Sequence, residues 1–528
     1  MEKDFLWWRD GIIYQIYPRS FYDTTGSGIG DLNGITEKLD YLGDLGVDAL
    51  WLSPINPSPD RDFGYDVSDY LSIDPKFGDM PDFERLIEKA AKKGIRIIMD
   101  LVLNHSSDQH PWFLESRSSR ENPKRDWYIW CDGKGNGQPP NNWLSVFGGS
   151  AWQWDEASGQ YYLHMFTNEQ PDLNWRNPAV RRQMLDVFRF WLEKGVKGFR
   201  LDVFNLYFKD AEFRDNPTRP LHIRPDQRQR MIYNCDLPEM MDVLAEIREL
   251  LDRYEDAYAV GETFLGSPEK AAGYCGKKAL HQAFLFDFLE CRWNPKCFSK
   301  VVKEWEAALA ETNWPNYVLN NHDVKRSASR YGQGEDDERL KVAAAMLLTL
   351  RGTPFLYYGE EIGMREVKLT RGQILDPVGQ RFWPFYKGRD GCRTPMQWSS
   401  GKNAGFSSDS PWLPLHPDWP DRNVENHEKG PESLLNFYKG LIALRKSEPV
   451  LLKGSLEFLE DMPSGMMAYR RELDARNAWI YLNFGQNIRR VAVPEVKISR
   501  VFSNKRKDLP DGQMIELLGN EALILISA

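Results

Sequence analysis

Apolar and polar positions alternate in a regular order over most of the chain. Short, nearly continuous apolar runs at 12–17, 49–53 and 96–102 are separated by amphipathic segments at 32–45 and 82–93. A buried strand has the first pattern, whereas an amphipathic helix places an apolar residue at every third or fourth position. The alternation therefore predicts βαβ units and a parallel sheet.

The same order returns after residue 175 and predicts the rest of the sheet. Further strands are predicted at 198–203, 258–262, 281–288, 317–321 and 354–358, and further helices at 179–194, 238–254, 295–310, 339–350 and 432–446. With the three earlier runs the chain has eight strands, which predicts a TIM-type (β/α)8 barrel.

Three regions depart from this order. Residues 106–174 are rich in Trp, Gly, Pro and Asn and are too long for a simple loop, so we expect a small domain inserted after strand 3. A long polar loop is expected at 362–431. Period-two segments at 478–484 and 522–527 predict a C-terminal antiparallel β domain. The predicted domains are a catalytic barrel (1–105 and 175–452), an inserted domain (106–174) and a C-terminal β-sandwich (453–528).

Composition and charge limit the partners. The chain is 41% hydrophobic and 27% charged, as in ordinary globular domains, and its net charge of −9 argues against nucleic acid or an anionic membrane as partner. It has no long uncharged apolar run and no signal-peptide pattern, so we expect a cytoplasmic protein without a membrane span. The oligomeric state is not indicated. The cysteines follow no zinc spacing and are expected to be reduced thiols: 131, 235, 275, 291, 297 and 392.

Charged residues follow four of the predicted strands. A single Asp after a strand usually caps a helix, and a single His is usually structural. Four such endings on the carboxyl face of one barrel, where barrel active sites lie, instead predict groups that tune one another's pKa. They are Asp100, Asn104 and His105 after strand 3, Arg200 and Asp202 after strand 4, Glu262 after strand 5, and His322 and Asp323 after strand 7.

These strand ends carry a family resemblance. The stretches DLVLNHSS, GFRLDVFN, VGETF and NNHD resemble the four signature stretches of the α-amylase superfamily of glycoside hydrolases, in the family's order. The stretches QPDLNW, YQIYPRSFYD, FGYDVSDY and RTPMQW resemble its oligo-1,6-glucosidase and α-glucosidase branch. The resemblance covers essentially the whole chain.

The resemblance implies a role for each strand-end residue. Asp202 is expected to be the nucleophile, Glu262 the general acid and then base, and Asp323 a transition-state stabiliser that holds sugar hydroxyls. Arg200, His322 and His105 are expected to contact the nucleophile or sugar, with Asp100 and Asn104 in support. Two carboxyl groups about 5–5.5 Å apart cleave a glycosidic bond with retention of configuration.

The resemblance also implies a closed sugar pocket. Asp62 and Arg393 are expected to pair and grip a terminal glucose, and Tyr65 is expected to stack on its ring. Phe147 and Phe166 are expected to wall the pocket, although core packing is an alternative for both. Val203, directly after the nucleophile, is associated in the family with α-1,6-linked substrates; the alternative is a residue that merely suits a β-strand.

A loop near the first helix resembles a cation site. Its candidate residues are Asp23, Thr25, Ser27, Ile29 and Asp31, and a structural Ca²⁺ or Mg²⁺ is the implied ion. Thr25 and Ser27 stand where cation-binding relatives have Asn or Asp, so a Gly-rich turn without metal is the alternative. No cofactor is expected for catalysis.

The function expected from the resemblance is a retaining, exo-acting α-glucosidase that releases terminal non-reducing glucose from short oligosaccharides. Val203 favours α-1,6 linkages of the isomaltose type, with α-1,4 linkages of the maltose type still open. Two alternatives remain. One is a sucrose isomerase, trehalose synthase or transglucosidase that uses the same site, and the other is a non-catalytic protein like the heavy chains of amino-acid transporters.

Overall fold

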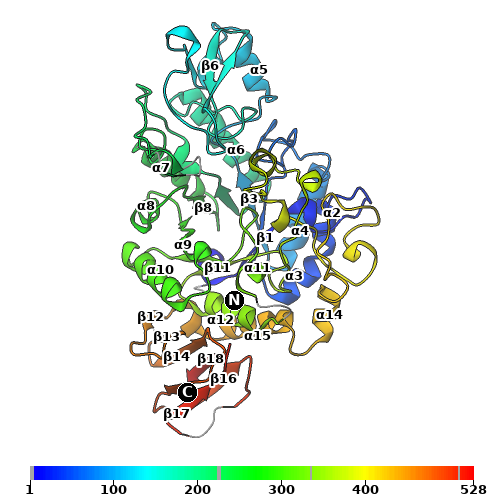
Figure 1. The fold of residues 1–528 in the computed structure, drawn as a ribbon, viewed down its shortest axis with the longest axis vertical. Coiled ribbons are helices and arrows are strands. Elements are labelled where there is room, and N and C mark those ends of the chain that lie inside the picture. Colours follow the sequence, from blue (N-terminus) through cyan, green and yellow to red (C-terminus); the bar gives the residue numbers. More distant parts are fainter. Residues whose placement is uncertain (1–4, 220, 223–226, 333–335, 509–511) are drawn as a thin grey trace.

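Eight parallel strands form a nearly closed barrel, which confirms the TIM-type fold (Figure 1). The computed structural model describes residues 5–219, 221–222, 227–332, 336–508 and 512–528. Strand β11 pairs with β1, and β9 lies beside β10 to complete the circuit. The strands are β1 (Ile13–Ile16), β2 (Ala49–Leu52), β3 (Arg96–Leu101), β7 (Gly198–Leu201), β8 (Tyr258–Glu262), β9 (Gln282–Phe284), β10 (Asn316–Val318) and β11 (Thr353–Tyr357).

Helices between the strands follow the predicted order, with two differences. The expected helix at 32–45 is divided at Lys38, whose ammonium lies 3.9 Å from the Tyr22 ring centroid. The expected strand at 281–288 is β9 followed by helix α9 (Asp287–Glu290), because a short apolar run does not distinguish a strand from a buried helix. The main helices are α2 (Leu32–Glu37), α3 (Leu39–Leu45), α4 (Met80–Lys92), α6 (Pro178–Glu193), α7 (Met240–Leu251), α10 (Pro295–Ala308), α12 (Glu338–Thr349) and α15 (Leu434–Ser447).

Alternate strand residues fill the barrel interior. Seven strands contribute to one buried apolar cluster, which includes Ile13, Trp51, Ile98, Val260 and Phe355. Their neighbours along each strand pack into a separate, larger cluster that includes residues of the surrounding helices. Since successive strand side chains point to opposite faces, each strand has one inward row, and that row continues to the mouth of the barrel.

Two smaller β regions extend the barrel. Between β3 and α6, helix α5 (Pro111–Ser118) accompanies an antiparallel sheet of β4 (Trp130–Cys131), β6 (Gln160–Leu163) and β5 (Trp152–Asp155). The C-terminal antiparallel domain is confirmed. Its larger sheet has the order β12 (Ser455–Phe458), β13 (Met466–Leu473), β14 (Arg476–Asn483), β18 (Ala522–Ser527) and β16 (Ile498–Ser503), beside a pair of β15 (Arg489–Ala492) and β17 (Met514–Leu517).

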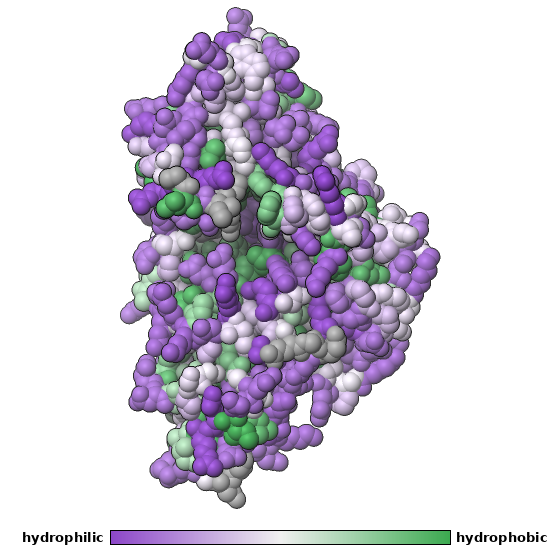
Figure 2. Space-filling view, in the orientation of Figure 1, coloured by the Kyte–Doolittle hydropathy of each residue, from purple (hydrophilic) through white to green (hydrophobic). Residues whose placement is uncertain are grey.

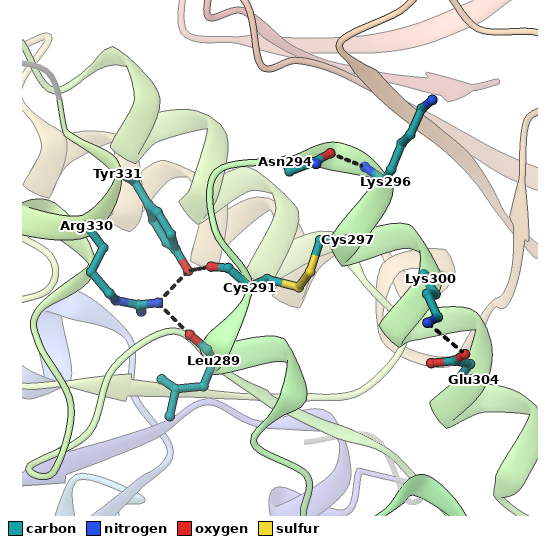
Figure 3. The surroundings of a disulfide bond; sticks show 9 residues. All are labelled: Leu289, Cys291, Asn294, Lys296, Cys297, Lys300, Glu304, Arg330 and Tyr331. Atoms are coloured by element: carbon teal, nitrogen blue, oxygen red, sulfur yellow. Dashed lines mark hydrogen bonds and ion pairs between the residues drawn. A yellow bond between two sulfur atoms is a disulfide. The ribbon is translucent and has the colours of Figure 1, made fainter. Parts of the chain in front are cut away.

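The expectation of six reduced cysteines is wrong for one pair. Cys291 follows α9 and Cys297 lies in the first turn of α10, and the tight turn between them brings their Cα atoms to 5.9 Å, where they form a disulfide (Figure 3). Asn294 caps α10 in this turn by accepting a hydrogen bond from the Lys296 N–H. Five residues separate the two cysteines, and because this spacing matches no familiar cysteine motif, the sequence did not indicate a disulfide.

The surface is hollowed between the region containing β6 and the barrel (Figure 2), at the place where Figure 1 draws the ends of β3 and β8. The long segment expected as a polar loop at 362–431 contains short helices, among them α13 (Pro377–Phe382) and α14 (Val424–Lys429). Within the described parts of the chain, no helix has the length and apolar character needed to cross a membrane.

Candidate active site

The inward rows of the strands change from apolar to charged at the carboxyl end. On β3, Asp100 follows two residues after Ile98, and on β8, Glu262 follows two residues after Val260. Between these strands, Arg200 of β7 is in register with Asp100. Residues two apart share a face of the sheet, so all three side chains enter the mouth of the barrel. This alternation explains how the predicted strand ends bring charged side chains together.

Arg200 joins three carboxyl groups. One of its terminal nitrogens lies 2.8 Å from Oδ1 of Asp100 and 2.6 Å from Oδ1 of Asp202. The other terminal nitrogen binds Glu262. One buried cation facing three carboxyl groups cannot balance full ionisation, which favours a proton on one of the three.

The three carboxyl groups bound by Arg200 differ in pKa. Burial raises the pKa of Glu262 to about 8, and the charges of Asp202 and Asp323 add to the rise while Arg200 opposes it. Burial raises the pKa of Asp202 to about 7 and that of Asp100 to about 6, again against Arg200. Glu262 therefore holds its proton most firmly at neutral pH, as a general acid must.

Val203, the residue after Asp202, contacts Glu262. Its backbone N–H donates to Oε2 of Glu262 at 3.3 Å. The residue has φ 34° and ψ 40°, a left-handed conformation that costs a β-branched residue about 1–3 kcal/mol. Strand β7 already ends at Leu201, so the interpretation of Val203 as an ordinary strand residue is wrong. The strained turn instead brings the residue after Asp202 against Glu262.

Asp323 stays ionised beside two arginines. Its Oδ1 lies 3.0 Å from Arg393 and 3.4 Å from Arg389. Burial acts to raise the pKa of Asp323, but His322 and the two arginines hold it well below its usual range. Burial lowers the pKa of His322 to about 3, so this imidazole is neutral at pH 7.

The partners of His322 define its tautomer. The Tyr65 hydroxyl donates to Oδ2 of Asp100 at 3.1 Å and lies 2.5 Å from Nε2 of His322, so that nitrogen carries the proton. Nδ1 accepts from the side-chain amide of Gln15 at 2.8 Å. The Tyr65 ring also stacks on the imidazole, with centroids 5.3 Å apart. Gln15 was not predicted, although it lies two residues after Ile13 on the inward row of β1.

His105 is fixed by residues from three segments. Its Nδ1 lies 3.1 Å from the Asn104 amide nitrogen, and its Nε2 lies 3.1 Å from Nε2 of Gln170. The buried ammonium of Lys209 donates to Asn104 at 2.8 Å and pairs with Asp172 at 2.5 Å. Lys209 thus joins the segment after β7 to the end of β3 and to the end of the inserted region. Gln170 and Lys209 were not predicted as site residues.

The expected pairing of Asp62 with Arg393 is wrong. Arg389 binds Asp62 at 2.5 Å and Asp376 at 2.8 Å. Arg393 is fully buried, donates from Nε to the His322 carbonyl at 2.8 Å, and pairs with Asp323.

A short helical turn, Asp390–Cys392, separates the two arginines and sends their side chains to different partners. The stretch RDGCRT contains two arginines only four residues apart, and spacing alone could not choose between them.

The two predicted aromatic residues lie beside these charged groups. The rings of Phe147 and Phe166 meet edge to face at 5.4 Å. Phe166 lies 5.1 Å from the His105 ring, and the guanidinium of Arg389 lies 5.3 Å from the Phe147 ring centroid. The inserted region therefore brings both rings next to residues of the barrel mouth.

Hydrogen bonds from the loop itself and from Ser407 hold the loop that is expected to bind a cation. Oδ1 of Asp23 accepts hydrogen bonds from Thr25 and Gly26, and Oδ2 accepts from Gly28 and Ser407. Asp31 accepts from Thr24 and caps α2 at Gly34, and the Ser27 hydroxyl donates to the Ile29 carbonyl. These hydrogen bonds use the carboxylate oxygens of Asp23 and Asp31 within the protein, whereas a hard cation needs six to eight oxygen ligands. The cation site stays a prediction, and no catalytic step depends on it.

Arg389 rather than Arg393 should control binding in the pocket. We expect Arg389→Ala to lower kcat/KM for a disaccharide about 10- to 100-fold, because it removes a charged donor and leaves Asp62 without its cation. Arg389→Lys keeps the charge but not the planar guanidinium, so its kcat/KM should lie between the values of the parent and of Arg389→Ala. Steady-state kinetics tests this expectation, with the melting temperature as control for folding. A kcat/KM for Arg389→Ala equal to that of the parent would contradict it.

Sequence comparisons agree with this geometry. The alpha-amylase catalytic domain family matches residues 15–454. A probable alpha-glucosidase of Rhizobium meliloti (strain 1021) is 47% identical over 478 residues, which cover 87% of this chain and 86% of that protein. An oligo-1,6-glucosidase of Parageobacillus thermoglucosidasius is 41% identical over 522 residues, 91% of each protein.

Solved structures resemble the whole chain. An alpha-glucosyl transfer enzyme is similar with a TM-score of 0.94 and 40% identity, covering 99% of this chain and all of that one. A variant isomaltulose synthase of Erwinia rhapontici NX5, in complex with sucrose, has a TM-score of 0.91 and 37% identity, covering 98% and 99%. With a barrel whose strand ends carry the predicted charged residues, and with matches over most of its length, the chain belongs to the alpha-amylase family of glycoside hydrolases.

Proposed function

We propose that this protein is a retaining, exo-acting α-glucosidase that releases terminal non-reducing glucose from short oligosaccharides. The observation that carries the proposal is the pair of Asp202 and Glu262 on one guanidinium, with the higher pKa on Glu262. An ionised carboxylate beside a protonated one is the arrangement that retaining glycosidases need.

The reaction follows in two steps. Glu262 donates its proton to the glycosidic oxygen as Asp202 attacks the anomeric carbon, so the old C–O bond breaks and a glucosyl ester forms. The leaving sugar departs with the proton. Glu262, now ionised, takes a proton from water, which attacks the anomeric carbon and releases Asp202. Two inversions give glucose of the original α configuration.

The remaining residues support one terminal sugar. Asp323 and Asp62 are carboxylates fixed by arginines, and they are suited to accept hydrogen bonds from sugar hydroxyls. Tyr65, His105 and Phe166 are also buried, with Tyr65 against His322 and Phe166 against His105. The ion pairs of Asp62 and Asp323 with arginines close one side of the site. A closed side leaves no room for a sugar chain beyond the terminal glucose, which favours cleavage at the chain end over cleavage within a long polymer.

A disaccharide panel tests the proposal. Isomaltose, maltose and sucrose are each incubated with the protein, and the products and their anomeric form are followed by NMR. On sucrose, whose leaving group is fructose, we expect α-glucose as the first product. Early release of β-glucose from sucrose would contradict retention, and internal cutting of long starch without early glucose would contradict exo action.

Isomerisation is the second candidate, and the similarity to an isomaltulose synthase structure favours it. Such an enzyme would form the same glucosyl ester and pass glucose back to the leaving sugar. On sucrose, the proposed hydrolase yields glucose and fructose, whereas an isomerase yields a new disaccharide. The same panel therefore separates the two.

Linkage preference is expected to depend on Val203. This residue is 5% exposed and lies in the apolar cluster that contains Phe166. Threonine has the same branching, so Val203→Thr keeps the backbone cost and changes only a methyl to a hydroxyl. Because one such contact is worth about 1–3 kcal/mol, the isomaltose-to-maltose ratio of kcat/KM should fall about ten-fold. A parent that strongly prefers maltose, or a ratio that does not change, would refute this role.

A further inference from the structure

A closed loop stands beside the pocket. It begins at Asp376 and returns at Arg389, the residue that binds Asp62. Asp376 accepts a hydrogen bond from the Arg389 N–H at 2.7 Å. The two ends of the loop approach so closely that a Cβ on Gly379 would lie 2.6 Å from the Lys387 carbonyl. The base of the loop is therefore fixed to the pocket by the pocket's own cation.

The same loop reaches the inserted region. A Cβ on Gly149 would lie 2.7 Å from the Arg381 guanidinium, so α13 approaches the segment that carries Phe147. Phe147 in turn lies against Arg389. The loop thus spans from the barrel to the inserted region on the side of the pocket where Arg389 lies.

Two aromatic side chains at the tip of the loop are exposed. Phe385 is 97% exposed and Tyr386 is 44% exposed. Within the described residues neither ring contacts another aromatic ring or a cation, whereas the neighbouring Phe382 and Trp383 lie beside Arg381 and Lys387. Single exposed apolar residues are common on protein surfaces, but two adjacent unpartnered rings next to a binding pocket indicate a ligand.

The tip is close to the reacting centre. Tyr386 is three residues from Arg389, so their Cα atoms are at most about 11 Å apart. Because more than half of Tyr386 is covered, burial raises its pKa to about 12, and the charges of Arg389, Asp376 and Asp323 also act on it. Tyr386 therefore lies within electrostatic reach of the pocket.

We propose that Phe385 and Tyr386 form an aromatic platform that binds the leaving-group sugars of the substrate, beyond the terminal glucose. This inference rests on the proposed function. Aromatic rings pack well against the apolar C–H face of a pyranose, and the Tyr386 hydroxyl can bond a sugar hydroxyl. The protein would then bind the second and third sugar units of the substrate, counted from the terminal glucose, as well as that glucose.

The test compares substrates with and without these units. For Phe385→Ala and for Tyr386→Ala, kcat/KM is measured on isomaltotriose and on α-glucosyl fluoride, which has no leaving-group sugar. We expect the isomaltotriose-to-fluoride ratio to fall about ten-fold, mainly through KM, as expected for the loss of one stacking contact. The matched control is Leu375→Ala, since Leu375 is 42% exposed at the base of the same loop. Its ratio should equal that of the parent.

The outcomes are distinguishable. A parent that cleaves isomaltotriose, with variants that keep its ratio, overturns the platform alone. The platform is also overturned if the variants keep the ratio but change the oligomeric state in sedimentation, because the rings then contact a second copy of the chain. A parent that turns over glucosyl fluoride but no oligosaccharide overturns the proposed function itself.

Discussion

Replacing Asp202 by Asn should remove nearly all turnover, by about 10⁴-fold or more in kcat. The amide has the same shape and still accepts a hydrogen bond from Arg200, which lies 2.6 Å from Oδ1 in the parent. It lacks the negative charge that attacks the anomeric carbon. The loss should appear in kcat for every substrate, including those that need no acid.

A matched control separates this chemical effect from loss of structure. Asp210 is also buried and bound to an arginine, Arg214, but it lies outside the site. Asp210→Asn should lose at most some thermal stability. Both variants are compared by melting temperature and by kcat on α-glucosyl fluoride. A folded Asp202→Asn variant with turnover within ten-fold of the parent would reject Asp202 as nucleophile.

The strand ends could be predicted because a local rule determines them. Side chains alternate across a strand, so Asp100, Arg200 and Glu262 had to point into the barrel once the register of its apolar residues was known. Gln15 follows the same rule, yet an amide in an apolar run carries no chemical signal of its own. Its role became visible only through its contact with His322.

Contacts between distant segments could not be predicted in this way. The partner of Asp62 depends on which of two arginines the turn at 390–392 directs to it. The disulfide depends on the tight turn between two helices. Each is a consequence of tertiary packing, which a pattern of hydrophobicity along the chain does not record.

The backbone at Val203 shows the same limit more sharply. A β-branched residue after an apolar strand predicts continued strand, and local preference disfavours φ 34°. The fold overrides that preference and brings the Val203 N–H to Glu262. Strain of this kind occurs where surrounding structure imposes it, often at functional sites. Local rules therefore fail at the residue that links the two proposed catalytic acids.

Glu262→Gln should separate the two steps of the reaction. The amide cannot donate a proton, so kcat/KM on isomaltose should fall about 10²- to 10⁴-fold. Glucosyl fluoride needs no protonation of its leaving group, so its first step should be retained. Attack by water then lacks a base, and a glucosyl ester should accumulate on Asp202. Mass spectrometry of peptides after a short reaction would locate it, and a glucosyl group on any other residue would reject the mechanism.

The pH profile gives an independent test of the same residue. In the parent, Glu262 must be protonated and Asp202 ionised, with pKa values raised to about 8 and about 7. The kcat/KM for isomaltose should therefore fall as pH rises through about 8 and also as it falls through about 7. In Glu262→Gln, formation of the ester from glucosyl fluoride should lose the alkaline limb and keep the acid limb. Azide, a nucleophile that needs no base, should restore turnover and yield an α-glucosyl azide. An azide product of β configuration, or an alkaline limb that survives the substitution, would show that Glu262 is not the acid/base.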